Sequence, residues 1–209
     1  MCKQKPYRYP DACIVIFARA PEYGKVKTRL AAGVGADAAL EAYRSLLEQT
    51  VLTAADSQLA PIELYVEGNL QDPLIEHLAQ YANATVMSQQ GDDLGARMYH
   101  ALQGVLQHSS RALIIGTDCP LMNGAYLESA LQCLTPDCEV AIGPSEDGGY
   151  VLIGATMADK RIFRNITWGS NSVMQQTRDA LYHANIRFDE LDVLWDVDLP
   201  EDYWRWKNE

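Results

Sequence analysis

Residues 19–29, RAPEYGKVKTR, concentrate basic side chains around one glycine, Gly24. Exposed backbone N–H groups on such a loop, the positive end of a following helix and mobile cations can together bind a diphosphate. A Walker A loop is excluded, because it needs Gly at position 19 and Ser or Thr at 26, where this chain has Arg19 and Val26. The alternative is an ordinary solvated basic loop. The residues that we expect to bind the diphosphate here are Ala18, Arg19, Lys25, Lys27 and Arg29.

An aspartate follows a short apolar run in the sequence LIIGTDCP, residues 113–120. A carboxylate at the end of a buried strand, facing a basic loop, can hold a hard divalent cation against a diphosphate. Asp118 is therefore a candidate metal ligand, and capping of a turn or of the next helix is its alternative use. Cys119 has no histidine near it in the sequence, so we expect a buried small residue there rather than a nucleophile.

Residues 143–150, GPSEDGGY, place Asp147 directly before two glycines. Glycines leave room for a ligand beside a carboxylate, and that carboxylate could accept a proton as a catalytic base. The alternative is a plain Asp-Gly turn in a hairpin. Adjacent side chains point apart, so only one of Glu146 and Asp147 should reach a site, and we favour Asp147.

The last acidic segment, WDVDLPED, begins at residue 195. On an extended segment Asp196 and Asp198 point to one side, where they could serve as cation ligands. The alternative is that Asp198 caps a final helix whose first turn contains Pro200.

Other patterns predict no chemistry. GVGADA at residues 33–38 fits the dinucleotide pattern GxGxxA, but it lies far beyond the end of the first strand, so we interpret it as the start of a helix. The four histidines lack metal spacing. The five cysteines form no CxxC pair, so neither a disulfide framework nor a zinc site is predicted, and reduced thiols favour the cytoplasm.

The net charge of the chain and its distribution along the sequence indicate which partners the protein can bind. The chain of 209 residues has a formal net charge of −11, which disfavours nucleic acid and anionic membranes as partners. Residues 1–29 nevertheless contain seven Lys or Arg and two acids, a balance of +5. A concentrated basic segment in an otherwise acidic protein is typical of an anion-binding site. The first apolar run, Ala12–Ala18, is too short to span a bilayer and reads as a core strand.

Short apolar strands alternate with amphipathic helices along the chain, which predicts an α/β sandwich with a mostly parallel mixed sheet. No linker divides the sequence, so we expect one domain over residues 1–209. The expected strands are 12–18, 62–66, 84–87, 112–116 and 139–142, with 150–155 as an antiparallel excursion and an alternating segment at 188–194. The expected helices are 36–54, 72–81, 93–106, 123–134 and 170–184. Ligands bind at the carboxyl ends of the strands in such sheets, which selects residues 19–29, 117–122 and 143–149.

In combination, five motifs resemble a family of small GT-A-type glycosyltransferases, the nucleotide-diphospho-sugar transferase fold. Its members are mostly known as domains of unknown function, and some are linked to arsenosugar biosynthesis. The resemblance runs from about residue 12 to residue 204, and its motifs are FARAPEYGKVKTRL, QQGDDLGARM, GTDCPLM, GPSEDGGYVLIG and DVDLPEDYW. More distantly, the chain is similar to 2-phospho-lactate guanylyltransferase and molybdenum cofactor guanylyltransferase.

The resemblance implies a role for each motif. Arg19, Lys25 and Arg29 would contact the nucleotide diphosphate, and Asp118 would be the metal carboxylate. The D-x-D pair of GT-A enzymes is incomplete, because position 116 is Gly. Asp198 would be the second acid near the metal, and Asp147 would lie on the acceptor side. The residues that would line the base or ribose pocket are Gly91, Asp92 and Gly95.

The resemblance favours an enzyme that transfers a sugar from a nucleotide-diphosphate donor to a small acceptor, assisted by Mg²⁺ or Mn²⁺. One alternative is a nucleotidyltransferase that joins an NTP to a small phosphorylated substrate and releases pyrophosphate. A third is a nucleotide-binding module without catalysis.

Overall fold

The computed structural model describes residues 6–208. Cys2 and two residues of the basic N-terminal count, Lys3 and Lys5, lie outside this range. The strands are β1 (Ala12–Arg19), β2 (Ile62–Glu67), β3 (Thr85–Ser88), β4 (Arg111–Ile115), β5 (Val140–Pro144), β6 (Tyr150–Ala155) and β7 (Phe188–Glu190). The helices are α1 (Thr28–Val34), α2 (Ala36–Ser57), α3 (Pro73–Ala82), α4 (Leu94–Val105), α5 (Gly124–Cys133), the 3₁₀ turn η1 (Lys160–Phe163), α6 (Val173–Ala184) and α7 (Pro200–Asn208).

The strands form one mixed sheet in the order β3-β2-β1-β4-β6-β5-β7. Among the strands of the described residues, only β6 runs antiparallel to both of its neighbours, β4 and β5. The predicted α/β sandwich with its antiparallel excursion at 150–155 is confirmed. Because the other strands are parallel, the loops that follow β1, β4 and β5 emerge at the same edge of the sheet.

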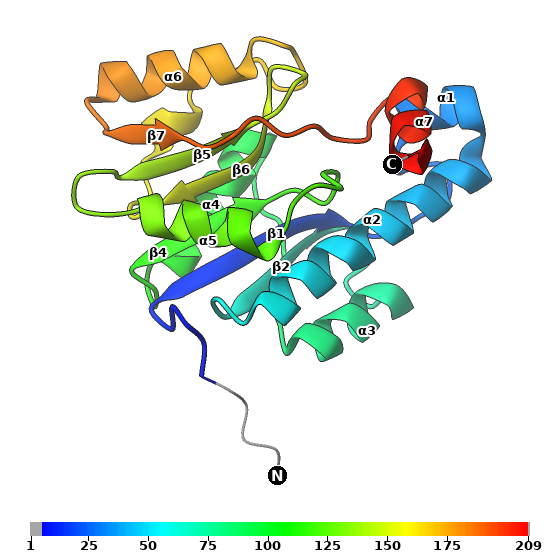
Figure 1. The fold of residues 1–209 in the computed structure, drawn as a ribbon, viewed down its shortest axis with the longest axis horizontal. Coiled ribbons are helices and arrows are strands. Elements are labelled where there is room, and N and C mark those ends of the chain that lie inside the picture. Colours follow the sequence, from blue (N-terminus) through cyan, green and yellow to red (C-terminus); the bar gives the residue numbers. More distant parts are fainter. Residues whose placement is uncertain (1–5, 209) are drawn as a thin grey trace.

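Helices cover both faces of the sheet (Figure 1). In β1, Ile14 and Ile16 pack toward α2, α3 and α5, whereas Cys13 and Val15 pack toward α4, η1 and α6. Burial on both faces explains why β1 is a continuous apolar run rather than an alternating one. A third, smaller core joins α1, α2 and α7 around Trp195 and Val197.

The alternating segment 188–194 forms a strand only at Phe188–Glu190, so the prediction for its second half was wrong. Its partner strand β5 ends at Pro144, where the register is irregular and no N–H is available to continue the ladder. Beyond β7 a single bridge pairs Leu194 with Ser145. The chain then crosses to α7 beside α1, as Figure 1 shows.

Helix α6 begins at Val173, three residues later than the predicted start at Ser170. The hydroxyl oxygens of Ser170 and Ser172 lie 2.7 Å apart, and the Ser170 hydroxyl donates to the Thr167 carbonyl. These local hydrogen bonds compete with the first helical turn.

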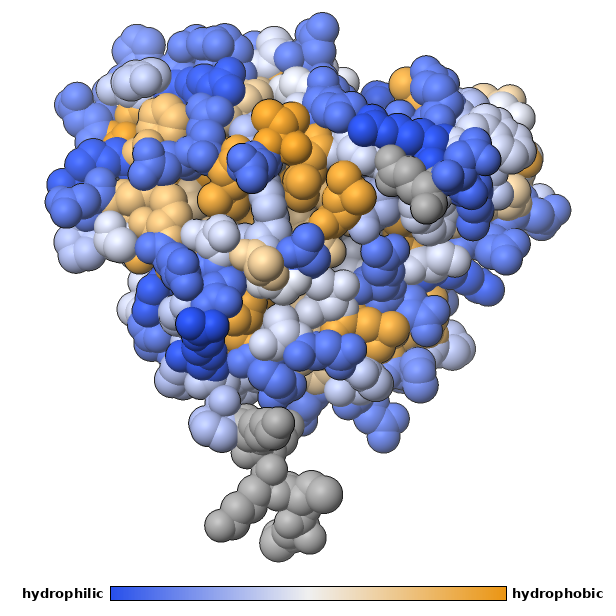
Figure 2. Space-filling view, viewed as in Figure 1, coloured by the Kyte–Doolittle hydropathy of each residue, from blue (hydrophilic) through white to orange (hydrophobic). Residues whose placement is uncertain are grey.

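Within the described residues, no helix is both long and apolar enough to cross a membrane. Figure 2 shows hydrophilic side chains around the rim of one face and apolar ones exposed near its centre. Exposed apolar side chains of this kind are common on globular proteins.

Candidate active site

A cleft of about 600 Å³ opens at the carboxyl ends of β1, β2 and β4, beside the first turn of α4. It brings together the basic segment, the end of β4 and the last acidic segment, which are far apart in the sequence. Its lining residues include Ala18, Arg19, Lys25, Lys27, Thr28, Arg29, Tyr43, Glu67, Gln89, Asp93, Arg97, Gly116, Thr117, Asp118 and Asp198.

Lys27 is an internal cation rather than a solvated one. Its backbone is left-handed (φ 49°), and its side chain is only 3% exposed. Nζ lies 2.7 Å from Oδ1 of Asp118 and donates to the Val197 carbonyl at 2.6 Å. The lysine therefore joins the basic loop to the other two site segments and compensates the charge of Asp118.

The other cations of the segment remain accessible. The side chains of Arg19, Lys25 and Arg29 are 59%, 73% and 62% exposed. Each contacts one carboxylate, that of Glu67, Glu22 or Asp198 respectively. Because exposed ion pairs are worth at most about 1 kcal/mol, an arriving phosphate can replace these partners at little cost.

The backbone of the loop is fixed by Tyr43 of α2. Its buried hydroxyl accepts from the Arg19 N–H at 2.7 Å and donates to the Arg19 carbonyl at 2.8 Å. Burial raises the pKa of Tyr43 to about 12, so it acts as a neutral clamp. Tyr43 falls within the expected helix 36–54, but nothing in the local sequence pattern links residue 43 to residue 19, so this role could not be predicted.

Asp118 follows β4, where its carbonyl accepts from the Val197 N–H at 2.8 Å. Oδ1 is buried and, despite its contact with Lys27, accepts no hydrogen bond of good geometry from the described residues. The carboxylate as a whole is 42% exposed toward the cleft. A carboxylate that is partly open to the cleft offers the oxygen ligands that Mg²⁺ or Mn²⁺ prefers.

Asp198 also lines the cleft, but it does not cap the last helix. Its Oδ2 accepts from Nη1 of Arg29 at 2.9 Å. The N–H groups of Asp198 and Leu199 donate instead to Oδ2 of Asp202, at 3.1 and 2.7 Å. The interpretation of Asp198 as an N-cap was therefore wrong, because Asp202 in the first turn supplies the acceptor and leaves Asp198 to the cleft.

Asp196 lies between the ends of β4 and β5. Its Oδ1 accepts from the hydroxyl of Ser145 at 2.6 Å. Burial raises its pKa to about 6, helped by the nearby charges of Asp147 and Asp118 and opposed by Ser145 and Lys27. The three aspartates are thus close enough to interact, although among the described residues they form no three-ligand metal cluster.

Asp147 is exposed and does not line the cleft that contains Asp118. Its Oδ1 accepts from the Gly149 N–H at 2.8 Å, which is the Asp-Gly turn considered above. Glu146 turns away and pairs with Arg205 through both oxygens, at 2.7 and 3.2 Å. The two neighbouring carboxylates therefore point apart, as expected.

The motif QQGDDLGARM contributes side chains other than those selected from the sequence. Gly91 and Asp92 are exposed outside the cleft lining, and Gly95 is buried where a Cβ would come within 2.7 Å of Trp168. Arg97 reaches the cleft instead, with Nη1 3.0 Å from the Glu67 carboxylate that Arg19 also contacts. The position of Arg97 on the first turn of an amphipathic helix was the available signal for it.

Gln89, in the same motif, links strands β1 and β2 by hydrogen bonds at the cleft. Its side-chain amide donates to the carbonyls of Ala18 and Tyr65, both at 3.0 Å. Cys119 is buried, which raises its pKa to about 11, so it is a protonated thiol rather than a nucleophile.

Comparison with known proteins places this arrangement in context. The profile of the family described as "Uncharacterized protein conserved in bacteria (DUF2064)" matches residues 50–170. A protein of Desulfovibrio desulfuricans G20, provisionally assigned as a nucleotide-diphospho-sugar transferase, is 32% identical, with a TM-score of 0.81 over 91% of this chain and 83% of its own. No curated protein matches the chain.

Two more distant structures share the fold alone. Glucosyl-3-phosphoglycerate synthase from Mycobacterium tuberculosis, solved with Mn²⁺, UDP and glucosyl-3-phosphoglycerate, is 11% identical, with a TM-score of 0.56 over 94% of this chain and 75% of its own. The 4-diphosphocytidyl-2C-methyl-D-erythritol synthase of Anaerococcus prevotii is also 11% identical, with a TM-score of 0.57 over 95% of this chain and all of its own.

Proposed function

The chain belongs to the DUF2064 family of bacterial proteins and has the nucleotide-diphospho-sugar transferase fold, and from this premise we propose that it transfers a sugar from a nucleotide-diphosphate donor to a small acceptor. The observation that carries the proposal is the cleft at the carboxyl edge of the sheet, where accessible cations surround Asp118. A diphosphate needs this combination, because its charge must be neutralised both in the bound donor and as the leaving group.

In this proposal Arg19, Lys25 and Arg29 exchange their exposed carboxylate partners for the donor phosphates. Lys27 keeps its buried contact with Asp118 and adds positive charge beside the diphosphate. Two features of the site support phosphate binding. Tyr43 holds the backbone of the basic loop in place, and the N-terminus of α4, where N–H groups favour an anion, faces the cleft. The base or ribose of the donor is assigned to the segment that carries Gly91, Asp92 and Gly95, with Arg97 as its residue in the cleft lining.

Asp118 and Asp198 are the residues that would hold Mg²⁺ or Mn²⁺. When bound, the ion would supply a Lewis acid for the departing diphosphate. The Asp118 carboxylate, 42% exposed toward the cleft although Lys27 pairs with its Oδ1, supports this assignment. Arg29 contacts Asp198 and would contribute positive charge on the same side.

On the acceptor side we assign Asp147 as the base that takes the proton from the attacking hydroxyl. Its Oδ1 is fixed by the turn to Gly149, and Oδ2 makes no hydrogen bond within the described residues. Asp196 and Ser145 are positioned between Asp147 and Asp118, so they link the acceptor side to the donor side.

Nucleotidyl transfer is the second candidate. One observation favours it: Gly116 stands where the first acid of the D-x-D pair of GT-A glycosyltransferases would be. Release of pyrophosphate from an NTP in the presence of sugar phosphates would support this candidate, and slow hydrolysis of a nucleotide-sugar without acceptor would support glycosyl transfer.

The deciding experiment measures thermal unfolding with nucleosides, nucleoside diphosphates and nucleotide-sugars, with and without Mn²⁺. Diphosphates should raise the melting temperature and nucleosides should not, since a ligand at 100 times its Kd adds about 2.7 kcal/mol. Replacing Lys25 and Arg29 together by Ala should abolish most of this shift. Asp118→Asn should keep the metal-free shift and lose the enhancement by Mn²⁺.

Equal shifts for nucleosides and diphosphates would contradict the proposal. Diphosphate binding without hydrolysis or transfer of any donor would instead identify a non-catalytic binding module. If EDTA leaves wild-type binding unchanged, the metal role of Asp118 is wrong.

A further inference from the structure

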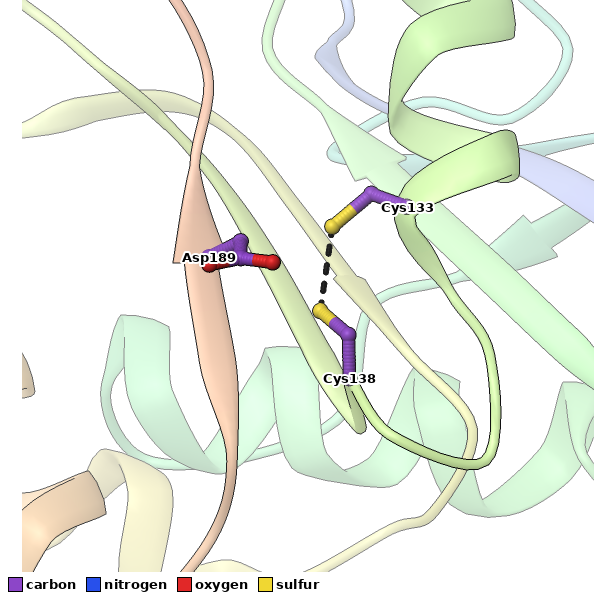
Figure 3. Close-up of side chains that lie close together, drawn as sticks. All are labelled: Cys133, Cys138 and Asp189. Carbon is purple, nitrogen blue, oxygen red and sulfur yellow. Dashed lines mark hydrogen bonds between the residues drawn. The ribbon is translucent and has the colours of Figure 1, made fainter.

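Two cysteines and an aspartate converge far from the cleft, on the α5 side of the sheet (Figure 3). Cys133 ends α5, Cys138 precedes β5 and Asp189 lies on β7. One ligand atom of each residue lies within 4.8 Å of the other two, and the sulfur atoms of the cysteines are 3.0 Å apart. Within the described residues no other group of three His, Cys, Asp or Glu side chains meets so closely.

The fold enforces this convergence. Thr135 and Cys138 exchange two backbone hydrogen bonds of 3.1 Å, which reverse the chain and return Cys138 to Cys133. On β7, Glu190 binds Arg178 of α6, so the preceding side chain, Asp189, points to the opposite face. Strand pairing sets Asp189 beside Ala141 of β5 and fixes its height along the sheet.

The donor set suits one class of ligand. The Asp189 carboxylate makes no hydrogen bond or ion pair within the described part of the chain, yet it faces two thiols. Two sulfurs and one carboxylate are ligands that zinc prefers, whereas magnesium and calcium prefer oxygen alone.

We propose that Cys133, Cys138 and Asp189 bind one zinc ion, with a water molecule as the fourth ligand. Binding releases the two thiol protons to solvent and leaves both cysteines as thiolates. Tetrahedral Zn–S bonds of about 2.3 Å separate two sulfurs by about 3.8 Å. The sulfur atoms, now 3.0 Å apart, therefore move apart by rotation of the cysteine side chains when the ion binds.

The ion would fasten an edge of the sheet. Strand β7 has three residues, and the segment that follows it carries Asp198 to the cleft. A site that joins α5, β5 and β7 would hold the start of that segment. The zinc site itself does not depend on the proposed function.

The test uses the full chain, stripped of metal with a chelator and kept reduced, and titrates it with Co²⁺ and then Zn²⁺. Co²⁺ should bind one ion per chain with a thiolate-to-cobalt absorption band that Zn²⁺ removes. Cys133→Ser and Cys138→Ser should each abolish the band. Asp189→Asn should weaken zinc binding at least about tenfold.

Two control variants should bind like the wild type: Cys13→Ala, which removes a buried thiol on the other face of the sheet, and Asp137→Asn, which removes an exposed carboxylate from the adjoining turn. Circular dichroism of each variant checks that it is folded. The proposal is overturned if Co²⁺ produces no thiolate band, or if Cys133→Ser retains it. It is also overturned if the reduced chain takes up no zinc while air oxidation couples Cys133 to Cys138, since the pair would then be a disulfide-forming pair only.

Discussion

Asp196 accepts a short hydrogen bond, but its surroundings disfavour the charged form of its carboxyl group. Ser145 donates to it at 2.6 Å and Lys27 is near, but burial and two neighbouring aspartates raise its pKa to about 6. A carboxyl group whose pKa is raised by folding stabilises the protein fully below its unfolded value, 3.8, and that contribution is lost as the pH rises through 6. At neutral pH the folded chain therefore holds a carboxylate at a cost.

Replacing Asp196 by Asn should remove that cost. The variant should gain stability over the wild type, and the gain should be about 2 kcal/mol larger at pH 8 than at pH 4.5. Urea unfolding at the two pH values measures it. Asp192→Asn, at an exposed position of the same segment, is the control and should give no such gain at pH 8. A gain for Asp196→Asn that does not depend on pH would show that packing, not charge, is responsible.

For Asp147 we predict an effect on turnover rather than on stability, because this residue is exposed and would act on the acceptor. Asp147→Asn keeps the size of the side chain and the turn to Gly149 but removes the base. Turnover should fall by about 10²–10⁴-fold while the affinity for the nucleotide donor stays near the wild-type value. Steady-state kinetics and donor titration separate the two quantities.

Glu146→Gln is the matched control, since Glu146 points to Arg205 instead of the acceptor side. Loss of donor affinity in Asp147→Asn with turnover unchanged would make Asp147 a ligand of the donor. If Asp147→Asn only lowers the melting temperature, the role of Asp147 is confined to the turn with Gly149.

At the scale of the elements, the contact between helices α1 and α7 fixes the position of the acidic segment that begins at Trp195. Gly33 of α1 lies against Pro200, the first residue of α7, and a Cβ on Gly33 would come within 2.4 Å of the proline ring. The helices can approach this closely only because position 33 has no side chain. Their contact sets the position of Asp198, two residues before Pro200.

Gly33→Ala should therefore destabilise the protein by about 1–3 kcal/mol, although Ala is the better helix former by about 1 kcal/mol. Gly104→Ala is the control, because that helical glycine of α4 has only an ordinary contact, 3.4 Å from the Tyr65 hydroxyl. It should be neutral or stabilising. Urea unfolding compares the two variants, and equal effects would mean that the Pro200 contact carries no strain.

At the scale of the whole molecule, charge is distributed so that an acidic protein can still hold an anion. The net charge is −11, yet residues 1–29 carry +5 and the remaining 180 residues carry −16. Three accessible cations of this segment, Arg19, Lys25 and Arg29, line the cleft, where they pair with Glu67, Glu22 and Asp198 respectively. Attraction of a diphosphate is therefore local and works against the field of the rest of the chain.

Salt should act oppositely on binding and on folding. Raising NaCl from about 50 to 500 mM should weaken nucleoside diphosphate binding by about tenfold, because it screens the exposed cations. The unliganded chain should become slightly more stable, because the same salt screens its net negative charge. Titration calorimetry and urea unfolding check the two trends. Binding that is insensitive to salt would show that the phosphates do not contact the exposed side chains.

The sequence by itself determined the fold class, most of the strands and helices, and the edge of the sheet that carries the cleft. Apolar runs such as Ala12–Arg19 and helical repeats such as Ala36–Ser57 are local, and each is encoded within a few turns of chain. The basic segment and Asp118 were also found, because both directly follow apolar strands.

Only the tertiary structure decided which side chains meet. Tyr43 clamps Arg19, Lys27 is buried against Asp118 and Val197, and Asp189 joins Cys133 and Cys138. Each of these contacts links residues far apart in the chain, and no local period encodes such a distance. They are set by strand order, by helix packing at points such as Gly33 and Pro200, and by the need of buried charges for partners.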